Sequence, residues 1–331
     1  MEITKEDRIL ITGGYGFLGR FVFLDLIKND YHDVHQYGGQ KDGYDLGESA
    51  HVGWLFDGIK PNVVIHLAEI NGHRSVKHPG GVMFENLNMG LRVIEEARQY
   101  DVKKFITVSD YNCYPHSCPV PMKEDDLWNG YPTPDVASYA IAKRTFLELS
   151  HSYSRQFRDF NTVNLIMPDL YGPSDHFHPH ALKFLPSLIT KIKYCIEKNI
   201  PTLDLAGIPN AEREFLSVKD AARAVRMSME DCHTSVPINV GAGASTTIHN
   251  AVEMCCKYMG YSGTIRWKEE PISGPTKRRL DTEKAKKEFG FESKINIEEG
   301  ISEMAKWSIE NLPDIKTYSN SQLPPRRGYT R

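Results

Sequence analysis

A short apolar segment that runs straight into closely spaced glycines limits the fold of this chain more than any other feature. The segment RILIT, Arg8–Thr12, leads into TGGYGFLG, and apolar residues at helical spacing follow from Phe17 to about Asn29. A buried strand, a glycine-rich turn and a helix form the first unit of a dinucleotide-binding sheet. Glycines let a pyrophosphate approach the backbone, and the helix N-terminus offers it free N–H groups. A tight turn with no ligand is the alternative interpretation.

Strand and helix segments alternate along the first half of the chain. Apolar, β-branched runs at Val63–Leu67, Lys104–Ser109 and Asn161–Met167 predict buried strands, and Val82–Tyr100 predicts a long helix. This alternation predicts parallel strands joined by crossovers, hence an α/β fold with a Rossmann-type, doubly wound parallel sheet. We expect this NAD(P)-binding domain to occupy residues 1–168.

Beyond residue 168 the predicted elements become shorter and more scattered. Residues 169–318 are expected to form mainly a smaller α/β substrate domain, with some chain crossing back to the first domain after residue 200. Residues 319–331 are polar and contain two prolines, which predicts an irregular tail. The expected elements are strands at Thr202–Leu205, Val236–Val240 and Thr264–Trp267, and helices at Ala181–Lys198, Val218–Glu230, Ile248–Met259 and Asn296–Asn311.

Charge and composition argue against several classes of function. The 331 residues carry a formal net charge of -3, without the long block of Lys and Arg expected of a general nucleic-acid or membrane-surface binder. No apolar run is long enough to span a bilayer, and the polar N-terminal residues lack the basic start of a secretory signal. Six cysteines without CxxC pairs fit reduced thiols, so we expect a cytoplasmic protein.

Alternating histidines in HFHPH, residues 176–180, are the pattern that most suggests a metal site. Pro179 interrupts a strand there, and no Cys or acidic ligand stands at a clear spacing. We therefore expect no metal.

The segment ASYAIAK places Tyr139 four residues before Lys143, so the two side chains share one face of a predicted helix. A lysine ammonium beside a phenol lowers the phenol pKa, because the cation favours the phenolate. Such a tyrosine can exchange a proton with a substrate hydroxyl or carbonyl near neutral pH. The alternative is two surface residues on a helix, but the dinucleotide fingerprint upstream favours the catalytic interpretation.

The end of the second strand indicates which nicotinamide cofactor the chain uses. An acid there binds the free ribose hydroxyls of NAD, whereas a cation suits the phosphate of NADP. No acid directly follows VHQY, and Lys41 lies nearby, so NADP(H) is favoured over NAD(H). Asp45 and Leu46 are expected to flank the adenine.

Together these motifs resemble the extended short-chain dehydrogenase/reductase family of nucleotide-sugar epimerases, dehydratases and reductases. The likeness rests on TGGYGFLG, HLAE, SYAIAK, LYGP and REFLSVKDAA, and it spans nearly the whole chain. Within the family, YAIAK, DLYGPSDHFHP and GPTKRRLD look most like the GDP-L-fucose synthases. The resemblance implies a nucleotide-sugar substrate and a homodimer formed by the helix pair at Val82–Tyr100 and Ser138–Phe157.

The resemblance also implies which residues form the site. The expected catalytic positions are Tyr139, Lys143 and Asp110. The expected cofactor contacts are Gly13, Gly14, Tyr15, Gly16, Phe17, Leu18, Gly19, Lys41, Asp45, Leu46, Leu67, Ala68, Glu69, Asn86, Val108, Tyr139, Lys143 and Pro168. The expected substrate contacts are Ser109, Asn112, Asp169, His178, Lys183, Arg213 and Arg278.

Two acids depart from the family pattern. Asp110 stands where the family has a Ser or Thr whose hydroxyl hydrogen-bonds the reacting sugar oxygen. A carboxylate donates a hydrogen bond only when protonated, and a second negative charge beside Tyr139 raises the phenol pKa. Asp169 replaces an Asn near the sugar-nucleotide diphosphate, where an acid repels phosphate unless a cation compensates.

Two further departures concern epimerisation. The GDP-L-fucose synthases use a Cys and a His to move protons at the two carbons beside the ketone. These positions correspond here to Asn112 and Lys183, with Cys113 one residue late. An asparagine cannot carry a proton on and off carbon, so epimerisation at C3 and C5 is in question while reduction is retained.

Three functional hypotheses follow. The first is an NADP(H)-dependent reductase, with or without epimerisation, of a nucleotide-linked 4-keto sugar, in which Tyr139 protonates the ketone oxygen. The second is an NAD-retaining nucleotide-sugar 4-epimerase with the same fold. The third is a catalytically weakened family member that binds cofactor as a structural or regulatory subunit, for which Asp110 and Asp169 are the motive.

Overall fold

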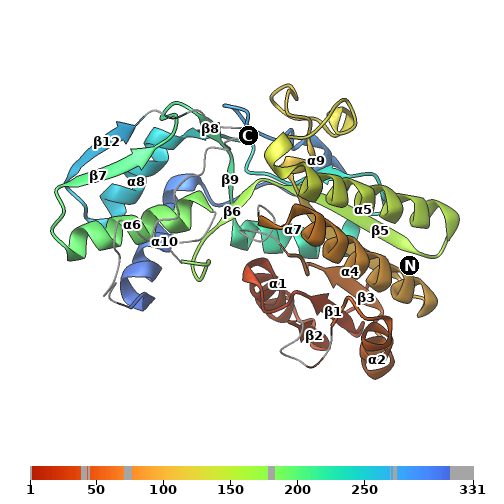
Figure 1. The fold of residues 1–331 in the computed structure, drawn as a ribbon. Coiled ribbons are helices and arrows are strands. Elements are labelled where there is room, and N and C mark those ends of the chain that lie inside the picture. Colours follow the sequence, from red (N-terminus) through yellow and green to blue (C-terminus); the bar gives the residue numbers. More distant parts are fainter. Residues whose placement is uncertain are drawn as a thin grey trace.

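The chain forms two lobes of unequal size (Figure 1). The computed structural model describes residues 2–38, 43, 45–70, 77–177, 183–268, 270 and 274–313. The larger lobe, at the right of Figure 1, contains the N-terminal strands, and the smaller lobe at the left contains segments from the second half of the chain.

A six-stranded sheet forms the centre of the larger lobe, with the strand order β10-β5-β4-β3-β1-β2. All neighbouring strands in it pair in parallel, which requires a crossover between consecutive strands. The expected doubly wound α/β fold is therefore confirmed. The strands are β1 (Ile9–Thr12), β2 (Val34–Tyr37), β3 (Val63–His66), β4 (Lys104–Asp110), β5 (Asn161–Met167) and β10 (Ile238–Asn239).

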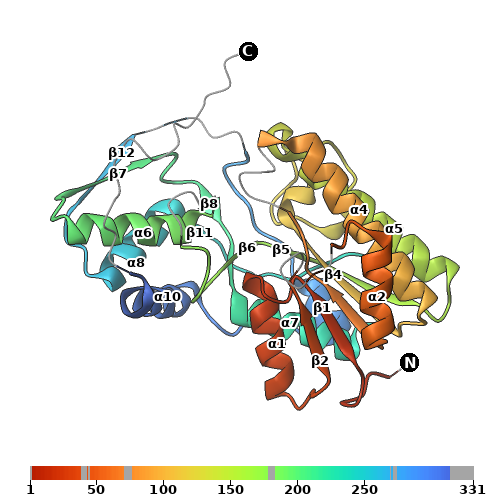
Figure 2. The same ribbon diagram turned by 60° about the horizontal axis from the view of Figure 1, so that its bottom comes forward.

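Central strands of this sheet bury side chains on both faces, which explains why their sequences are continuous apolar runs. In β1, Ile9 and Ile11 belong to one apolar cluster and Leu10 to another, because successive side chains point to opposite faces. Figure 2 shows the two helix layers on opposite sides of the strands. One layer holds α1 (Phe17–Lys28) and α7 (Val218–Asp231), and the other holds α2 (Ser49–Ile59), α4 (Pro79–Gln99) and α5 (Ala137–Gln156).

The chain returns to the larger lobe after it has entered the smaller one. Helix α7 packs against α1, and β10 joins the edge of the sheet beside β5. Helix α9 (Glu283–Phe289) packs in turn against α7 and β10. Segments well beyond residue 200 therefore complete the sheet and one of its helix layers.

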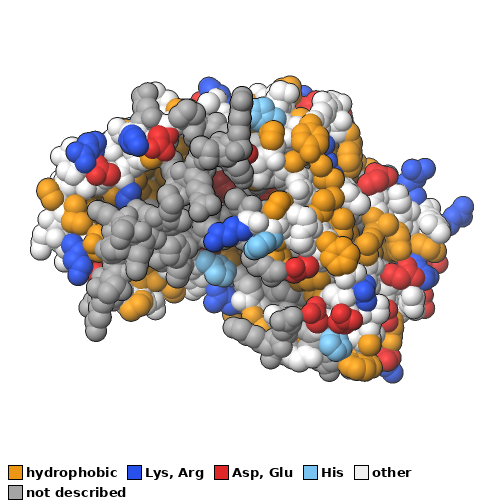
Figure 3. Space-filling view, in the orientation of Figure 1, with side chains coloured by type: hydrophobic (Ala, Val, Ile, Leu, Met, Phe, Trp, Pro, Cys, Tyr) orange, Lys and Arg blue, Asp and Glu red, His pale blue; other side chains and the backbone are white. Residues whose placement is uncertain are grey.

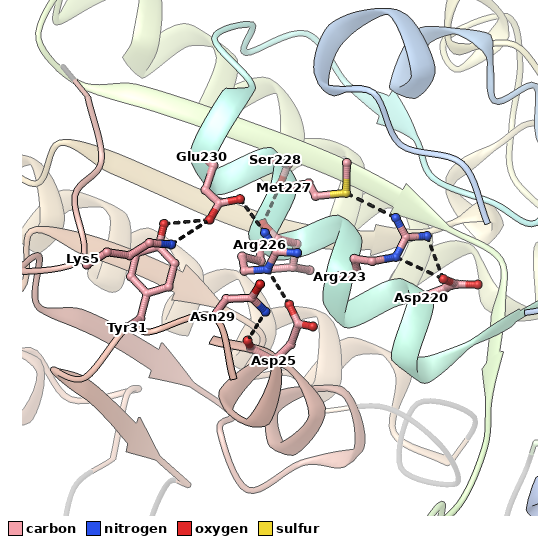
Figure 4. A network of polar contacts seen from close by, with 11 residues as sticks. Lys5, Asp25, Asn29, Tyr31, Asp220, Arg223, Arg226, Met227, Ser228 and Glu230 are labelled. Atoms are coloured by element: carbon pink, nitrogen blue, oxygen red, sulfur yellow. Dashed lines mark hydrogen bonds and ion pairs between the residues drawn. The ribbon is translucent and has the colours of Figure 1, made fainter. Parts of the chain in front are cut away.

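A polar network joins α7 to α1 and to the segment that follows α1 (Figure 4). The guanidinium of Arg226 donates to Asp25 Oδ2 at 2.7 Å and to Glu230 Oε2 at 2.5 Å. The Tyr31 hydroxyl donates to Glu230 Oε1 at 2.9 Å. The side chains of Arg226, Asp25 and Glu230 are only 14%, 20% and 22% exposed, so these ion pairs are partly shielded from water.

The smaller lobe has an apolar core of its own, formed by α6 (Phe184–Glu197), α8 (Ile248–Met259) and α10 (Ile297–Asn311). Parallel strands β7 (Thr202–Ala206) and β12 (Thr264–Lys268) cover it. Two short strand pairs are also present. They are β6 (Asp169–Tyr171) with β9 (Phe215–Ser217), and β8 (Glu212–Arg213) with β11 (Thr246–Thr247).

Some elements differ from the sequence-based expectation. Helix α2 was not predicted, although Val52, Leu55 and Phe56 bury one of its faces. Helix α9 and the four short strands β6, β8, β9 and β11 were not predicted either. The expected irregular tail, residues 319–331, lies outside the described residues. Within the described ranges, no helix combines the length and the apolar character needed to cross a membrane.

We expect Arg226→Met to lower the free energy of unfolding by about 2 kcal/mol, because the partly buried Asp25 carboxylate loses its cation and Glu230 keeps only Lys5. Urea denaturation followed by circular dichroism measures this change. Arg266→Met is the matched control, since Arg266 pairs with Asp204 through two nitrogens on the surface of the smaller lobe. That exposed pair is expected to leave the midpoint nearly unchanged. Equal midpoints for the two variants would contradict a stabilising role of the α1–α7 network.

Candidate functional site

A cleft with a volume of about 910 Å³ lies where four parallel strands end. Gly13 follows β1, Leu67 follows β3, Asp110 ends β4 and Pro168 follows β5, and all four line the cleft. Crevices at the carboxyl ends of such strands are where open α/β sheets bind ligands. Lys183, at the start of α6, also lines the cleft, so the smaller lobe contributes to its wall.

The glycine turn permits a contact that no larger residue would allow. A Cβ on Gly19 would stand 2.3 Å from Gly13 O and 2.7 Å from Gly14 Cα. Gly13 has a φ of +71°, and a Cβ there would stand 2.7 Å from Ala68 N. The first turn of α1 is thereby held close against the end of β1, and Gly13 is held close against the end of β3.

The start of α1 suits an anionic ligand. Gly16 is its N-cap residue, no side chain caps it, and the first turn contains no acid. The first N–H groups of the helix therefore lie at the lining of the cleft without an intrahelical acceptor, and the helix dipole adds partial positive charge there. These features fit a dinucleotide pyrophosphate.

Most of the expected cofactor residues line this cleft. They are Gly13, Tyr15, Gly16, Phe17, Leu18, Gly19, Asp45, Leu46, Leu67, Ala68, Glu69, Val108, Tyr139 and Pro168. Gly14 is absent from the lining, and its N–H donates to Tyr37 O at 2.9 Å, which joins the turn to β2. Lys41, on which the NADP(H) expectation partly rested, lies outside the described residues.

Helix α4 lines the cleft with different residues from the expected one. Glu85, Asn88 and Met89 form part of the wall, at the spacing of one helical face. Asn86 turns elsewhere, because its side chain donates to Ile70 O at 2.8 Å and accepts from Ile70 N at 2.7 Å. The apolar periodicity of the segment was available in the sequence, but it did not indicate which face would meet a ligand.

The Tyr139 hydroxyl lies between two carboxylates. Its oxygen is 2.6 Å from Asp110 Oδ2 and 3.1 Å from Glu69 Oε2. The Lys143 ammonium lies 2.5 Å from that same Glu69 oxygen and donates to Val108 O at 3.1 Å. Tyr139 lines the same cleft as the glycine turn, while Lys143 lines a separate small cavity of about 20 Å³.

The expectation that Lys143 would lower the phenol pKa is wrong for this arrangement. Burial, followed by the charges of Asp110 and Glu69, raises the pKa of Tyr139 well above its usual value. Burial opposes the charged form of Lys143, but Glu69 and Asp110 outweigh it and raise the Lys143 pKa. The lysine cation is therefore retained but is largely neutralised by Glu69, a contact that the i to i+4 spacing does not reveal.

The four expected substrate residues Asn112, Asp169, Arg213 and Arg278 lie together beside the cleft. Arg278 donates to Asn112 Oδ1 at 2.6 Å, and its guanidinium lies 4.9 Å from the centre of the Tyr111 ring. The Tyr111 hydroxyl donates to Asp169 Oδ2. Arg213 is close enough to Asp169 and Arg278 to interact with both charges.

This arrangement answers the objection that Asp169 would repel a phosphate, because two guanidinium groups lie beside it. Asn112 and Asp169 line the cleft itself, whereas the two arginines stand just outside its lining. Within the described residues, Arg278 Nε is buried and has no hydrogen-bond acceptor. The charges present therefore suit an anionic substrate better than Asp169 alone would.

Two other expected substrate residues, Lys183 and Ser109, line the cleft but also contact neighbouring protein side chains. Lys183 lies 3.4 Å from Asp175 Oδ1 and 4.5 Å from the centre of the Phe17 ring, at the rim of the cleft. Ser109 also lines the cleft, but its Oγ contacts the buried Cys113 Sγ at 2.9 Å. Burial and nearby Asp110 raise the pKa of the Cys113 thiol to about 12, which leaves it protonated and unreactive.

The segment HFHPH is only partly described, and its first histidine, His176, lines the cleft. His178, the expected substrate contact, lies outside the described residues. In the described part of the chain, no three His, Cys, Asp or Glu side chains form a group able to hold a metal ion.

Known proteins resemble this chain over most of its length. The model of the NAD dependent epimerase/dehydratase family matches residues 9–241. The chain is 28% identical over 307 residues to the GDP-L-colitose synthase of Yersinia pseudotuberculosis, covering 91% of this chain and 98% of that protein. It is 29% identical over 320 residues to the GDP-L-fucose synthase of Escherichia coli (strain K12), covering 93% and 98%.

A solved structure gives the corresponding comparison of folds. The GDP-mannoheptose C4 reductase of Campylobacter jejuni, solved with NADP bound, aligns with a TM-score of 0.84 at 23% identity. The alignment covers 93% of this chain and 99% of that one. At this identity the likeness establishes the shared fold.

We expect Gly19→Ala to weaken NADPH binding by at least about tenfold, or 1.4 kcal/mol, because the new methyl group would collide with the Gly13 carbonyl. Isothermal titration calorimetry measures the affinity. Gly58→Ala in α2 is the control, since a Cβ there meets no atom within 4 Å. Unchanged affinity in a folded Gly19→Ala protein would contradict pyrophosphate binding at this turn.

Proposed function

We propose, from the premise that this chain belongs to the NAD dependent epimerase/dehydratase family, that it is an NADP(H)-dependent reductase of a nucleotide-linked 4-keto sugar. The observation that carries the proposal is the position of the Tyr139 hydroxyl. It lines the same cleft as the glycine turn and the end of β4, so a proton donor and a dinucleotide cradle face one volume.

In the proposed reaction the protein supplies protons, position and charge. When bound, the nicotinamide cofactor supplies the hydride that reduces the ketone carbon. Tyr139 Oη donates its proton to the ketone oxygen as negative charge develops there. Lys143, fixed by Glu69 and the Val108 carbonyl, keeps positive charge beside the tyrosine as that proton leaves.

The charges beside the cleft support a nucleotide diphosphate substrate. Arg213 and Arg278 offer two guanidinium groups, and guanidinium forks suit phosphate oxygens. The names of the relatives point the same way, because the Yersinia and Escherichia proteins are synthases of GDP sugars. The Campylobacter enzyme is a C4 reductase of a GDP sugar.

Support for NADP(H) over NAD(H) comes from the sequence and from one relative. No acid directly follows β2, where an NAD-binding carboxylate would be expected. The Campylobacter reductase was solved with NADP bound. Both observations favour the phosphorylated cofactor.

We further propose that reduction proceeds without epimerisation at C3 or C5. Asn112 stands at the position expected for one proton-transfer group, and its amide oxygen is held by Arg278. Lys183 stands at the other, and its ammonium is near Asp175. An amide carries no dissociable proton near neutral pH, and an ammonium has no lone pair with which to accept one.

A homodimer and a cytoplasmic location complete the proposal. Helices α4 and α5 pack side by side, and Phe84 and Leu91 of α4 are 69% and 44% exposed. Figure 3 shows hydrophobic side chains gathered over this part of the surface. All six cysteines are free, which suits a reducing compartment.

Tyr139→Phe is expected to lower kcat for NADPH oxidation with GDP-4-keto-6-deoxymannose by about 10²–10⁴-fold, the usual contribution of a general acid. Absorbance of NADPH measures the rate, and calorimetry should give unchanged NADPH affinity. Tyr153→Phe is the matched control on the same helix, because the Tyr153 hydroxyl donates to Glu95 away from the cleft. Equal turnover by Tyr139→Phe and the wild type would favour the weakened-subunit hypothesis.

Reduction in deuterium oxide tests the absence of epimerisation. We expect the product to carry no deuterium on C3 or C5, since neither Asn112 nor Lys183 can remove a carbon-bound proton there. Nuclear magnetic resonance of the product locates any label, and a GDP-L-fucose synthase run in parallel is the positive control. Deuterium at either carbon beyond a no-enzyme blank would refute this part of the proposal.

A further inference from the structure

We propose that Asp110 is a second proton donor of this site, holding a proton at neutral pH and passing it to Tyr139 when Tyr139 protonates the substrate. The inference deepens the proposed reductase function and rests on it. It assigns a role to the residue that replaces the family's hydroxyl at this position.

Counting protons gives the first argument. Tyr139 Oη has acceptors on two sides, Asp110 Oδ2 at 2.6 Å and Glu69 Oε2 at 3.1 Å, but a phenol has one hydrogen. If both carboxyl groups were ionised, one of these contacts would join two oxygens with no hydrogen between them. A proton on Asp110 satisfies both contacts, because Asp110 then donates to Tyr139 and Tyr139 donates to Glu69.

Charge compensation gives the second argument. The Lys143 ammonium is paired with Glu69 at 2.5 Å and hydrogen-bonded to the Val108 carbonyl. The hydrogen-bond contacts of the Asp110 carboxyl in the described structure are Tyr139 Oη and the N–H of Asn112, at 2.7 Å from Oδ1. Asp110 is half-buried at the wall of the cleft, and a partly desolvated carboxylate with no cation in contact is less favourable than the neutral acid.

The surroundings of Asp110 agree with a protonated side chain. Burial raises the pKa of Asp110, Glu69 adds to the rise, and Tyr139, Lys143 and the Asn112 N–H oppose it without reversing it. The Cys113 thiol is buried and its pKa is raised, so it stays neutral and does not offset a negative charge on Asp110. An aspartic acid kept neutral by a buried site can donate a hydrogen bond at neutral pH.

The geometry also fixes the direction of transfer. The Asn112 N–H holds Oδ1, so Oδ2 is the oxygen that faces Tyr139. The contact to Asp110 is shorter than the contact to Glu69, which leaves the phenolic hydrogen on the weaker side and able to turn to a substrate oxygen.

The proton steps balance as follows. The O–H bond of Tyr139 breaks, and its proton forms the O–H bond of the new sugar alcohol. The hydride that reduces the ketone carbon would come from the nicotinamide cofactor, as in the proposed function. The O–H bond of Asp110 Oδ2 then breaks and an O–H bond re-forms on Tyr139 Oη. Asp110 is left as a carboxylate and takes one proton from water once product has left.

Infrared spectroscopy of the full-length protein without substrate tests the proton directly. The difference spectrum of wild type minus Asp110→Asn at pH 7 is expected to contain the carbonyl stretch of a carboxylic acid, shifted in deuterium oxide. Wild type minus Asp110→Ser should contain the same band, which keeps the test valid if one variant does not fold. Difference spectra that contain only carboxylate bands would overturn the proposal.

Asp204→Asn is the matched control for this measurement. Asp204 is ion-paired with Arg266 on the surface, and the Arg266 hydrogen bond lowers its pKa. The difference spectrum of wild type minus Asp204→Asn should therefore contain carboxylate bands and no carboxylic acid band. An acid band of equal size in this control would mean that the signal does not report Asp110, and would count against the inference.

A kinetic measurement separates this proposal from the reductase function. The wild-type single-turnover rate should fall as pH rises through the raised pKa of Asp110, and Asp110→Asn should be at least about tenfold slower and lack that pH limb. If Asp110→Asn turned over the sugar with the rate and pH profile of the wild type, the proposed proton transfer from Asp110 would be overturned and the proposed reductase function would stand. A carboxylic acid band in a protein that turns over no sugar would instead support the protonated state of Asp110 and contradict the proposed reductase function.

Discussion

The close contact between the first turn of α1 and the end of β1 is the constraint on which the rest of the site depends. No side chain separates Gly19 from the Gly13 carbonyl, so the helix N-terminus can approach the strand ends to within a backbone contact. That approach fixes where a pyrophosphate can lie and hence which part of a dinucleotide reaches the end of β4. In the proposed reaction, Asp110 and Tyr139 act on a ligand held at this anchor, which lines the same cleft as they do.

Charge around Tyr139 is balanced differently from what a tyrosine–lysine pair alone would suggest. The cation of Lys143 is largely offset by Glu69, and Asp110 approaches the phenol from the other side. The phenol is thereby kept in its protonated form, which suits a group that gives a proton to a ketone rather than one that removes a proton from an alcohol. Asp110, which departs from the family pattern, thus acts together with Glu69 to favour the direction of reduction.

Local patterns made much of the fold predictable. The β-branched run at Asn161–Met167 and the helical spacing at Ile248–Met259 gave elements with the bounds of β5 and α8. The glycine turn and the pairing of Tyr139 with Lys143 also depend on neighbours in sequence. Contacts between distant segments could not be read in this way. Glu69 reaches Lys143 only after β3 and α5 are brought together, and the choice of Asn88 over Asn86 as a cleft residue depends on how α4 rotates against the sheet.

The return of the chain to the larger lobe has a mechanical consequence. The polypeptide leaves the large sheet after β5, comes back as α7 and β10, and leaves again for α8. Several segments of the chain therefore connect the two lobes, whereas a single linker would allow them to rotate freely relative to each other. Any widening of the cleft has to bend all of these spans together, so small sliding displacements of packed helices are favoured over a wide hinge opening. Severing the polypeptide near residue 168 would leave the large sheet without its edge strand and without one of its covering helices, and neither fragment would be a self-sufficient folding unit.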